Sequence, residues 1–307
     1  MKVMKIKCSK WGIAAILLLL AVPKASIAQQ YIDPALSGSY KTLLNPSFNA
    51  LLTQGEGDAA LLYRYQWVGL EGAPKSLWFN GNIGIGQRNI ALDINAKQFS
   101  IGVEKSTEVS ANFTKILPIS EVEFIGLGVN LGYTRQSGDY SSLDPADPAF
   151  GNVAYGTLLY GLSASLVRPD RYYVGVSLPR VIFGKNDSDY VRQFGRDNTY
   201  YISGGAVFDL DESIYIRPAF LVSYREVTNL SFDASAMLFF TSKFGIGAGY
   251  RQRGDLMGLA EFNFAKLRLA YSYQQNLKNS NLNRYITNST HELGLSVSFG
   301  KNTKSRL

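Results

Sequence analysis

The chain repeats one pattern over residues 58–299: short segments in which apolar residues alternate with small or polar ones, separated by turn residues. The pattern is regular over residues 125–133, where Leu127 and its alternates are apolar while Gly128 and its alternates are small or polar. Successive side chains of a strand point to opposite faces, so each segment predicts a strand with one apolar face. The chain holds about fourteen such segments, and slipping one turn near residues 104–106 would reduce them to about twelve.

A closed barrel in a membrane accounts for this pattern. A bilayer accepts backbone only as helices or as closed sheets, because unpaired N–H and C=O groups are not tolerated in hydrocarbon. A soluble sandwich shows the same alternation, but here the apolar rows often end in an aromatic residue such as Tyr133 or Tyr250, and the opposite rows include Arg217 and Arg268. We therefore expect an all-β fold, a transmembrane antiparallel up-and-down β-barrel of the outer membrane.

The lengths of the connections predict the orientation of this barrel. Tight connections are expected at residues 168–170, 210–212 and 241–243 and near Ala265, and long ones at residues 138–154, 179–198 and 275–290. Each tight connection follows an even-numbered predicted strand, and each long one follows an odd-numbered strand. A barrel whose N-terminus lies in the periplasm has short periplasmic turns and long outer loops in this order.

The first 28 residues have the three parts of a secretory signal. Four lysines precede the apolar run over residues 11–22, and Ser26 and Ala28 provide the small residues of a cleavage site before Gln29. Removing residues 1–28 takes away five of the 31 Lys and Arg and none of the 24 Asp and Glu, which leaves a net charge of +2. The basic character of the whole chain is therefore no evidence for nucleic-acid binding. The single cysteine, Cys8, leaves with the signal, so no disulfide is expected.

Three further parts are expected in the mature chain. Residues 29–57 contain Pro34 and Asn45-Pro46 and alternate little, which predicts an N-terminal segment in or beneath the periplasmic mouth; whether it plugs the lumen stays open. Residues 58–300 form the barrel. Residues 301–307 form a short basic tail after the aromatic residue Phe299.

No residue pattern points to catalysis or to a bound cofactor. The one histidine, His291, shares its parity with Leu293, which places it on the outward face without a nucleophile at a suitable spacing. Asp139, Asp144 and Asp147 have oxygen ligands for Ca²⁺, but their spacing matches no calcium loop. The glycine repeats within strands open no helix, so they are not phosphate loops. We expect a protein that is not an enzyme and that holds no cofactor or metal.

Several short motifs resemble those of one family. They are Asn45-Pro46; Tyr63, Arg64, Gln66 and Trp67 of one strand end; Gly72-Ala73-Pro74 directly after it; and His291-Glu292 opening the last strand. In this order and over nearly the whole mature chain, the sequence resembles the PorP/SprF family of type IX secretion system outer-membrane proteins. It departs from the family pattern at Tyr65, Ser76 and Ser47, where Asn, Thr and Ala are usual.

The resemblance implies a non-enzymatic accessory barrel of the type IX secretion system in Bacteroidetes. Such a protein is expected to assist secretion or surface attachment of cargo with a C-terminal sorting domain, including gliding adhesins. The implied partners are the translocon barrel, periplasmic and lipoprotein components, the cargo and outer-membrane lipid, and not nucleic acid. The motif residues listed above are then candidate partner-binding residues.

Two alternatives stay open at this point. The barrel could be a general porin, with Arg64, Arg217, Arg251 and Arg268 lining an anion-preferring pore, or these arginines could pair internally with Glu261 and Asp233. Likewise, Trp67 and residues 72–75 could present a binding edge at the first outer turn, or they could simply hold that hairpin together.

Overall fold

The computed structural model describes residues 33–52, 55–86, 89–142, 151–181, 198–225, 229–252, 254–277, 289–300 and 306–307. The predicted signal peptide, Asp144 and Asp147 lie outside the described residues, as does the tail between residues 301 and 305. Within the described ranges, no helix combines the length and the apolar character that crossing a membrane requires.

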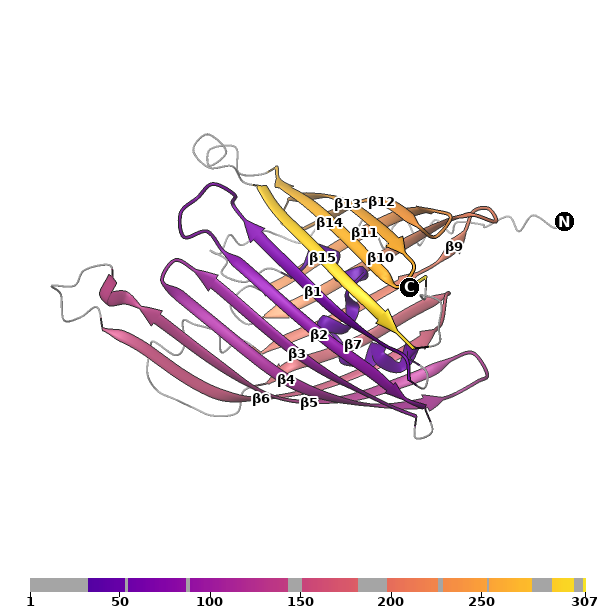
Figure 1. Cartoon of the computed structure of the whole chain (residues 1–307), viewed down its shortest axis with the longest axis horizontal. Coiled ribbons are helices and arrows are strands. Elements are labelled where there is room, and N and C mark those ends of the chain that lie inside the picture. Colours follow the sequence, from indigo (N-terminus) through magenta and orange to yellow (C-terminus); the bar gives the residue numbers. More distant parts are fainter. Residues whose placement is uncertain are drawn as a thin grey trace.

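One antiparallel sheet makes up the wall (Figure 1). Its strands are β1 (Gly57–Gln66), β2 (Lys75–Ile85), β3 (Ile90–Ile101), β4 (Glu104–Pro118), β5 (Phe124–Asp139), β6 (Asn152–Arg168), β7 (Tyr172–Val181), β8 (Thr199–Ala206), β9 (Phe208–Asp209), β10 (Ile214–Arg225), β11 (Asn229–Phe240), β12 (Phe244–Arg251), β13 (Asp255–Phe264), β14 (Leu267–Asn276) and β15 (Ser289–Phe299). Each strand pairs with its neighbours in the chain, except that β8 and β9 both pair with β10 and not with each other. Because β1 also pairs with β15, the sheet is closed. We call this β1–β15 pairing the seam.

The number of strands in the wall is fourteen, as predicted. The two residues of β9 continue β8 beyond Val207 and pair with the same neighbour, β10, so β8 and β9 are one strand of the barrel. The turn predicted near residues 104–106 lies two residues earlier, at Gly102-Val103, and β4 already begins at Glu104. The alternative of twelve strands is therefore wrong.

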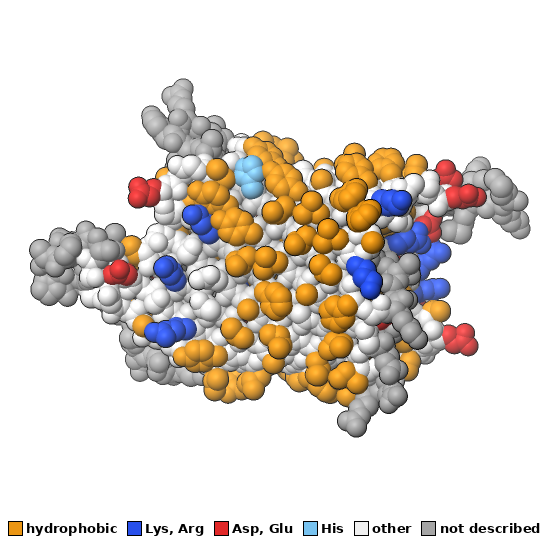
Figure 2. All heavy atoms as spheres, viewed as in Figure 1, with side chains coloured by type: hydrophobic (Ala, Val, Ile, Leu, Met, Phe, Trp, Pro, Cys, Tyr) orange, Lys and Arg blue, Asp and Glu red, His pale blue; other side chains and the backbone are white. Residues whose placement is uncertain are grey.

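The predicted alternation separates two faces of the wall. Outward-facing residues are mostly apolar and exposed, and on the face shown in Figure 2 many of them gather in a broad region across the strands. Examples, each from a different strand, are Leu61, Phe79, Ile94, Phe113, Val129, Leu162, Ile246, Leu269 and Leu295. Their neighbours in sequence face the lumen and are buried and largely polar. A polar interior with an apolar exterior is the reverse of a soluble sandwich and is typical of a membrane barrel.

The turns predicted to be tight all lie at one end of the barrel, although the turn at 102–103, at the other end, is just as short. The described turns at 169–171, 210–213, 241–243 and 265–266 all connect strands at the former end, and several of their residues have positive φ, among them Asp170 (56°) and Ala265 (47°). The long connections after β5, β7 and β14 lie at the other end. We call these the periplasmic end and the outer end, following the rule for outer-membrane barrels.

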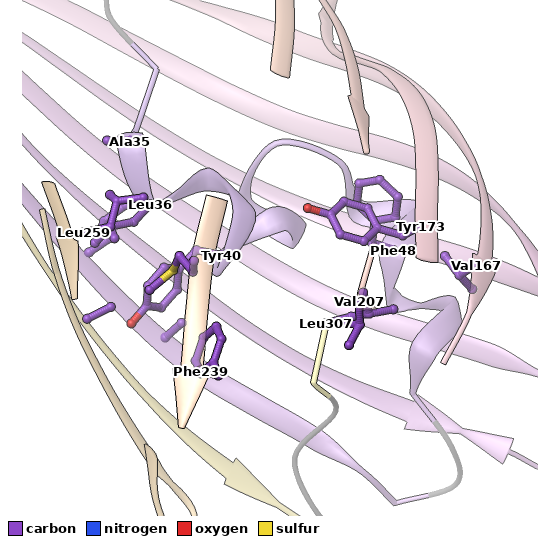
Figure 3. Packing of buried hydrophobic residues seen from close by; sticks show 14 of the residues in the cluster. Ala35, Leu36, Tyr40, Phe48, Val167, Tyr173, Val207, Phe239, Leu259 and Leu307 are labelled. Carbon is purple, nitrogen blue, oxygen red and sulfur yellow. The ribbon is translucent and has the colours of Figure 1, made fainter. Parts of the chain in front are cut away.

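The N-terminal segment lies inside the barrel. It contains three short 3₁₀ helices, η1 (Ala35–Gly38), η2 (Lys41–Leu43) and η3 (Pro46–Leu51). Its side chains Leu36, Tyr40 and Phe48 are buried in one cluster with residues of the wall (Figure 3). These wall residues include Val167, Tyr173, Phe239 and Leu259. The apolar core of the molecule therefore lies between the wall and residues 33–52, which we call the plug.

The end of the described chain also returns to the barrel. The Arg306 guanidinium forms an ion pair with Asp209 (2.5 Å), and its backbone N–H donates to Asp170 (2.7 Å) at the periplasmic end. Leu307 is buried in the same cluster, beside Val207 (Figure 3). These two residues of the predicted basic tail thus pack against the barrel.

Candidate functional site

The plug crosses the lumen from the outer end to the periplasmic end. Its first described residue, Asp33, contacts Arg225 and Arg251, which are the outermost residues of β10 and β12. Further along, Ser47 contacts Ser165, which lies three residues from the periplasmic end of β6. The interface between plug and wall is the largest set of buried polar contacts among the described residues, and we treat it as the candidate site.

The outer anchor of the plug is Asp33. Its carboxylate pairs with Arg225 and accepts a hydrogen bond from the Tyr201 hydroxyl (2.7 Å). Its backbone carbonyl accepts from Arg251 (2.8 Å), which in turn pairs with Asp233 (2.6 Å). Burial raises the pKa of the Asp33 carboxyl, but Arg225, Tyr201 and Arg251 together outweigh burial and hold this pKa below its usual value. Because the pKa is lowered, this anchor is present at neutral pH and is lost only as the pH falls through that value.

The second anchor lies at the seam. Arg64 of β1 and Glu292 of β15 are directly paired across the two strands and form a buried ion pair, each about 1% exposed. Glu292 also accepts the backbone N–H groups of Ala35 (2.9 Å) and Leu36 (3.1 Å) at the start of η1, and the side-chain amide of Gln274 (3.1 Å). One carboxylate therefore joins the closing strands of the barrel to the first turn of the plug.

The third anchor is Glu261 of β13. It pairs with Arg217 (2.8 Å) and Arg268 (3.4 Å) and accepts a hydrogen bond from the Ser39 hydroxyl of the plug (2.6 Å). Arg268 also donates to the backbone carbonyl of Ser39 (2.9 Å). The four arginines that could have lined a pore are thus all paired, and their partners are Glu292, Glu261 and Asp233.

The periplasmic half of the plug is held through Asn45-Pro46. The Asn45 side chain caps η3 by accepting a hydrogen bond from the Ser47 N–H (3.0 Å). Pro46 occupies the first position of this helix, where a backbone N–H would have no acceptor within the helix, so proline is tolerated there. Residues of the wall form hydrogen bonds with this turn. Asn45 donates to the Val176 carbonyl (3.2 Å), and Thr114 donates to the Pro46 carbonyl (3.1 Å).

Glycines of the wall make room for the plug. A Cβ at Gly126 would lie 2.2 Å from the backbone carbonyl oxygen of Ser47, and a Cβ at Gly175 would lie 2.6 Å from the Asn45 amide. A Cβ at Gly294 would lie 2.5 Å from the ring of Tyr40. Strand glycines often mark such a close approach of two backbones.

Replacing Gly126 by Ala is expected to displace η3 and to lower the free energy of unfolding by about 1–3 kcal/mol, the usual effect of overpacking. The added methyl group meets the backbone of Ser47, which cannot move as a side-chain end can. Thermal unfolding of the purified protein in detergent measures the effect. The matched control is Gly258→Ala, where the nearest atom lies 4.0 Å away. Equal melting temperatures for the two variants would contradict a tight contact between plug and wall.

The structure divides the candidate motif residues among different surroundings. It brings Arg64 and Glu292 together at the plug, whereas Asn45 and Pro46 lie in the plug itself. Gln66 is buried, and its N–H donates to the Pro74 carbonyl (3.0 Å). Tyr63 and His291 face outward, where His291 Nδ1 lies 2.7 Å from the Tyr271 hydroxyl.

The remaining motif residues shape the connection between β1 and β2. Trp67 has a φ of 51° and Gly72 a φ of 71°, and Ala73 is buried. The Gly72 carbonyl accepts the N–H of Gly102 (2.8 Å) from the turn between β3 and β4. A Cβ at Gly72 would lie 3.2 Å from the Cα of Gly102. These contacts favour the reading in which the motif holds the first outer hairpin against its neighbour.

Sequence reasoning missed three residues of the outer anchor: Asp33, Arg225 and Tyr201. Arg225 and Tyr201 could have been found from parity, since each occupies a lumen-facing position of an alternating strand. Asp33 gives no such signal, because it lies in a segment without alternation, and only the packed structure places it between Arg225 and Arg251.

Solved structures with a similar fold are outer-membrane barrels. The crystal structure of the Pseudomonas putida toluene transporter TodX matches with 10% identity and a TM-score of 0.50, over 91% of this chain and 97% of that chain. A Pseudomonas aeruginosa FadL homologue matches with 12% identity and a TM-score of 0.49, over 83% and 92%. At such identities the likeness concerns the fold alone.

Sequence comparison gives the family. No curated protein matches the chain. The family model described as "Type IX secretion system membrane protein PorP/SprF" matches residues 29–297, nearly the whole barrel together with the plug. With the closed barrel and its apolar outward face, this match places the protein in the outer membrane. The chain belongs to the PorP/SprF family of type IX secretion system membrane proteins.

Proposed function

We propose that this protein is a non-enzymatic accessory component of the type IX secretion system. It assists secretion or surface attachment of cargo that carries a C-terminal sorting domain, gliding adhesins among them. The observation that carries the proposal is the plugged barrel of a type IX family member. Residues 33–52 fill the lumen and are held at four buried carboxyl groups, those of Asp33, Asp93, Glu261 and Glu292. A barrel built in this way acts through its surfaces rather than through its lumen.

The plug argues against the general porin. A solute channel needs an open, hydrated lumen. Here the lumen-facing arginines pair with carboxylates instead of facing a water-filled path. The plug backbone also forms hydrogen bonds with different parts of the wall, at Ser165 and at Glu292. Beside Gly38, Lys41 and Tyr173, the space left between plug and wall is about 10 Å³, roughly the room that one water molecule needs.

The two ends of the barrel are the natural contact surfaces. The outer loops face the cell surface, where cargo arrives, and the periplasmic turns face the soluble and lipoprotein parts of the machine. We propose that the translocon barrel and cargo meet the outer end and the membrane-embedded wall. An enzymatic role finds no support at His291, which faces outward beside Tyr271 and Tyr273.

The test is a proteomic comparison of cell surface and culture fluid between wild type and an in-frame deletion. We expect one or a few proteins with C-terminal sorting domains to disappear from the surface, while uptake of small solutes is unchanged. Complementation with His291→Ala is expected to restore secretion fully. Unchanged secretion together with reduced uptake of a solute would instead support the porin and would refute the proposal.

A further inference from the structure

A group of basic side chains lies on the outward face near the outer end of β2, β4 and β5. Lys75, Lys105 and Arg135 are all exposed there. Ser100 of β3 is the cross-strand partner of Lys75 on one side and of Lys105 on the other, so the two lysines lie in one row with β3 between them. Two strand spacings separate them by about 10 Å. Arg135 lies one step lower on β5, opposite Thr107, and thus diagonally beside Lys105, at about 7–8 Å.

None of these three cations forms an ion pair within the described part of the chain; Lys75 lies over the ring of Tyr65 at 4.9 Å. The contrast with the lumen is clear, since Arg64, Arg217, Arg225 and Arg251 are all paired there. Two exposed acids lie nearby, Asp139 further out on β5 and Glu71 in the first outer hairpin.

The row marks the upper border of the apolar surface. Toward the membrane centre, the outward-facing positions become apolar or aromatic within one or two steps along each strand, at Leu77, Val109 and Tyr133. Figure 2 shows Lys and Arg side chains bordering the apolar surface on this side. Elsewhere around the described outer rim, the outward positions are neutral or aromatic: Tyr200, Tyr224, Leu230, Tyr250, Leu256 and Tyr273. The basic group is therefore confined to one sector of the wall.

We propose that Lys75, Lys105 and Arg135 bind the phosphate groups of the glycolipid in the outer leaflet. At this height, directly above an apolar and aromatic band, the groups that a membrane presents are lipid headgroups. Ammonium and guanidinium groups bind phosphate by charge-assisted hydrogen bonds, and clusters of them near a membrane surface recognise anionic lipid. Ser100, Thr107, Gln98 and Ser137 lie between the cations in the register and supply further donors for phosphate or sugar oxygens.

The experiment measures binding of phosphorylated lipid A to the purified full-length protein in detergent by native mass spectrometry. The test variant is Lys75→Gln/Lys105→Gln/Arg135→Gln. The control, Arg168→Gln/Lys243→Gln/Lys266→Gln, removes the same charge at the periplasmic end. The test variant is expected to bind on the order of a hundredfold more weakly than wild type, because each cation contributes about a factor of five or more near an anionic surface. The control is expected to bind like wild type.

Dephosphorylated lipid A supplies the second arm. Wild type and the test variant are expected to bind it equally and weakly, because the proposed contacts are to phosphate. The three side chains of the test variant are exposed and point outward, those of the control lie at the periplasmic turns or at a strand end, and the characteristic shift of the folded barrel on gels verifies folding. Wild-type affinity in the test variant would overturn the proposal. Equal losses in both triple variants would also overturn it, since the effect would then follow net charge rather than this sector.

Discussion

Replacing Glu292 by Gln is expected to loosen the plug and to lower the free energy of unfolding by about 3–5 kcal/mol. The substitution preserves shape but leaves the Arg64 guanidinium buried without its counter-charge. It also weakens the acceptor for the N–H groups of Ala35 and Leu36, which begin η1. Amide hydrogen exchange over residues 33–52, together with thermal unfolding in detergent, measures both consequences.

Two companion variants make this prediction specific. Arg64→Gln/Glu292→Gln removes both charges, so no charge is left buried alone, and it is expected to be less destabilised than Glu292→Gln. Arg171→Gln removes one partner of the exposed pair with Asp209, where we expect an effect of about 0–1 kcal/mol. If Glu292→Gln were no more harmful than Arg171→Gln, the seam would not anchor the plug.

Buried ion pairs of this kind are better explained by their effect on the position of the plug than by a contribution to the free energy of unfolding. Removing charges from water is unfavourable, and apolar residues would often fill the same space at lower free energy. In this barrel, however, each carboxylate is matched to one part of the plug: Asp33 to the outer end, Glu292 to η1 and Glu261 to Ser39. A plug shifted along the lumen would leave charges unpaired, so the pairs define its position.

The wall could be predicted from the sequence because its signal is local. In each strand, the alternation of residue types shows which face is apolar; Leu127 and Gly128, for example, lie on opposite faces. The tight turns contain residues such as Asp170 and Ser242, which adopt positive φ. Neighbouring strands are also neighbours in the chain, so strand count and orientation need no long-range information. The error of two residues at the β3–β4 turn arose where Gly102 and Val103 give a turn too short to leave a clear break in the pattern.

The plug could not be predicted in the same way. Its residues have no periodicity, and each of its contacts joins positions far apart in the chain, such as Asp33 with Arg225 or Ala35 with Glu292. The sequence left open whether Arg64, Arg217, Arg251 and Arg268 line a pore or pair internally with Glu261 and Asp233. The burial of the plug against these side chains decides between the two, and this is a property of the packed molecule.

Deleting residues 33–52 is expected to convert a closed barrel into a channel. The plug fills the space between opposite walls, with Leu36 and Tyr40 against one side and Phe48 against the other. Without it, the polar lumen side chains would face water, as they do in porins. In planar bilayers, we expect discrete openings from the deletion variant and none from wild type, and about tenfold or more faster influx of small solutes into liposomes. Equal conductance of both proteins would show that the plug does not close the lumen.

The complementary test fixes the plug in place while secretion is measured. The mature chain is expected to have no cysteine, so an introduced pair supplies its only thiols. An ideal Cβ at Gly38 lies 3.2 Å from the Cβ of Ala219, close to the roughly 3.5–4.5 Å that a disulfide spans. Because we propose that the protein acts through its surfaces, Gly38→Cys/Ala219→Cys is expected to support secretion equally well when oxidised and when reduced. Secretion that stops on oxidation and returns with reductant would mean that the plug must leave the lumen, and the barrel would then have to act as a conduit.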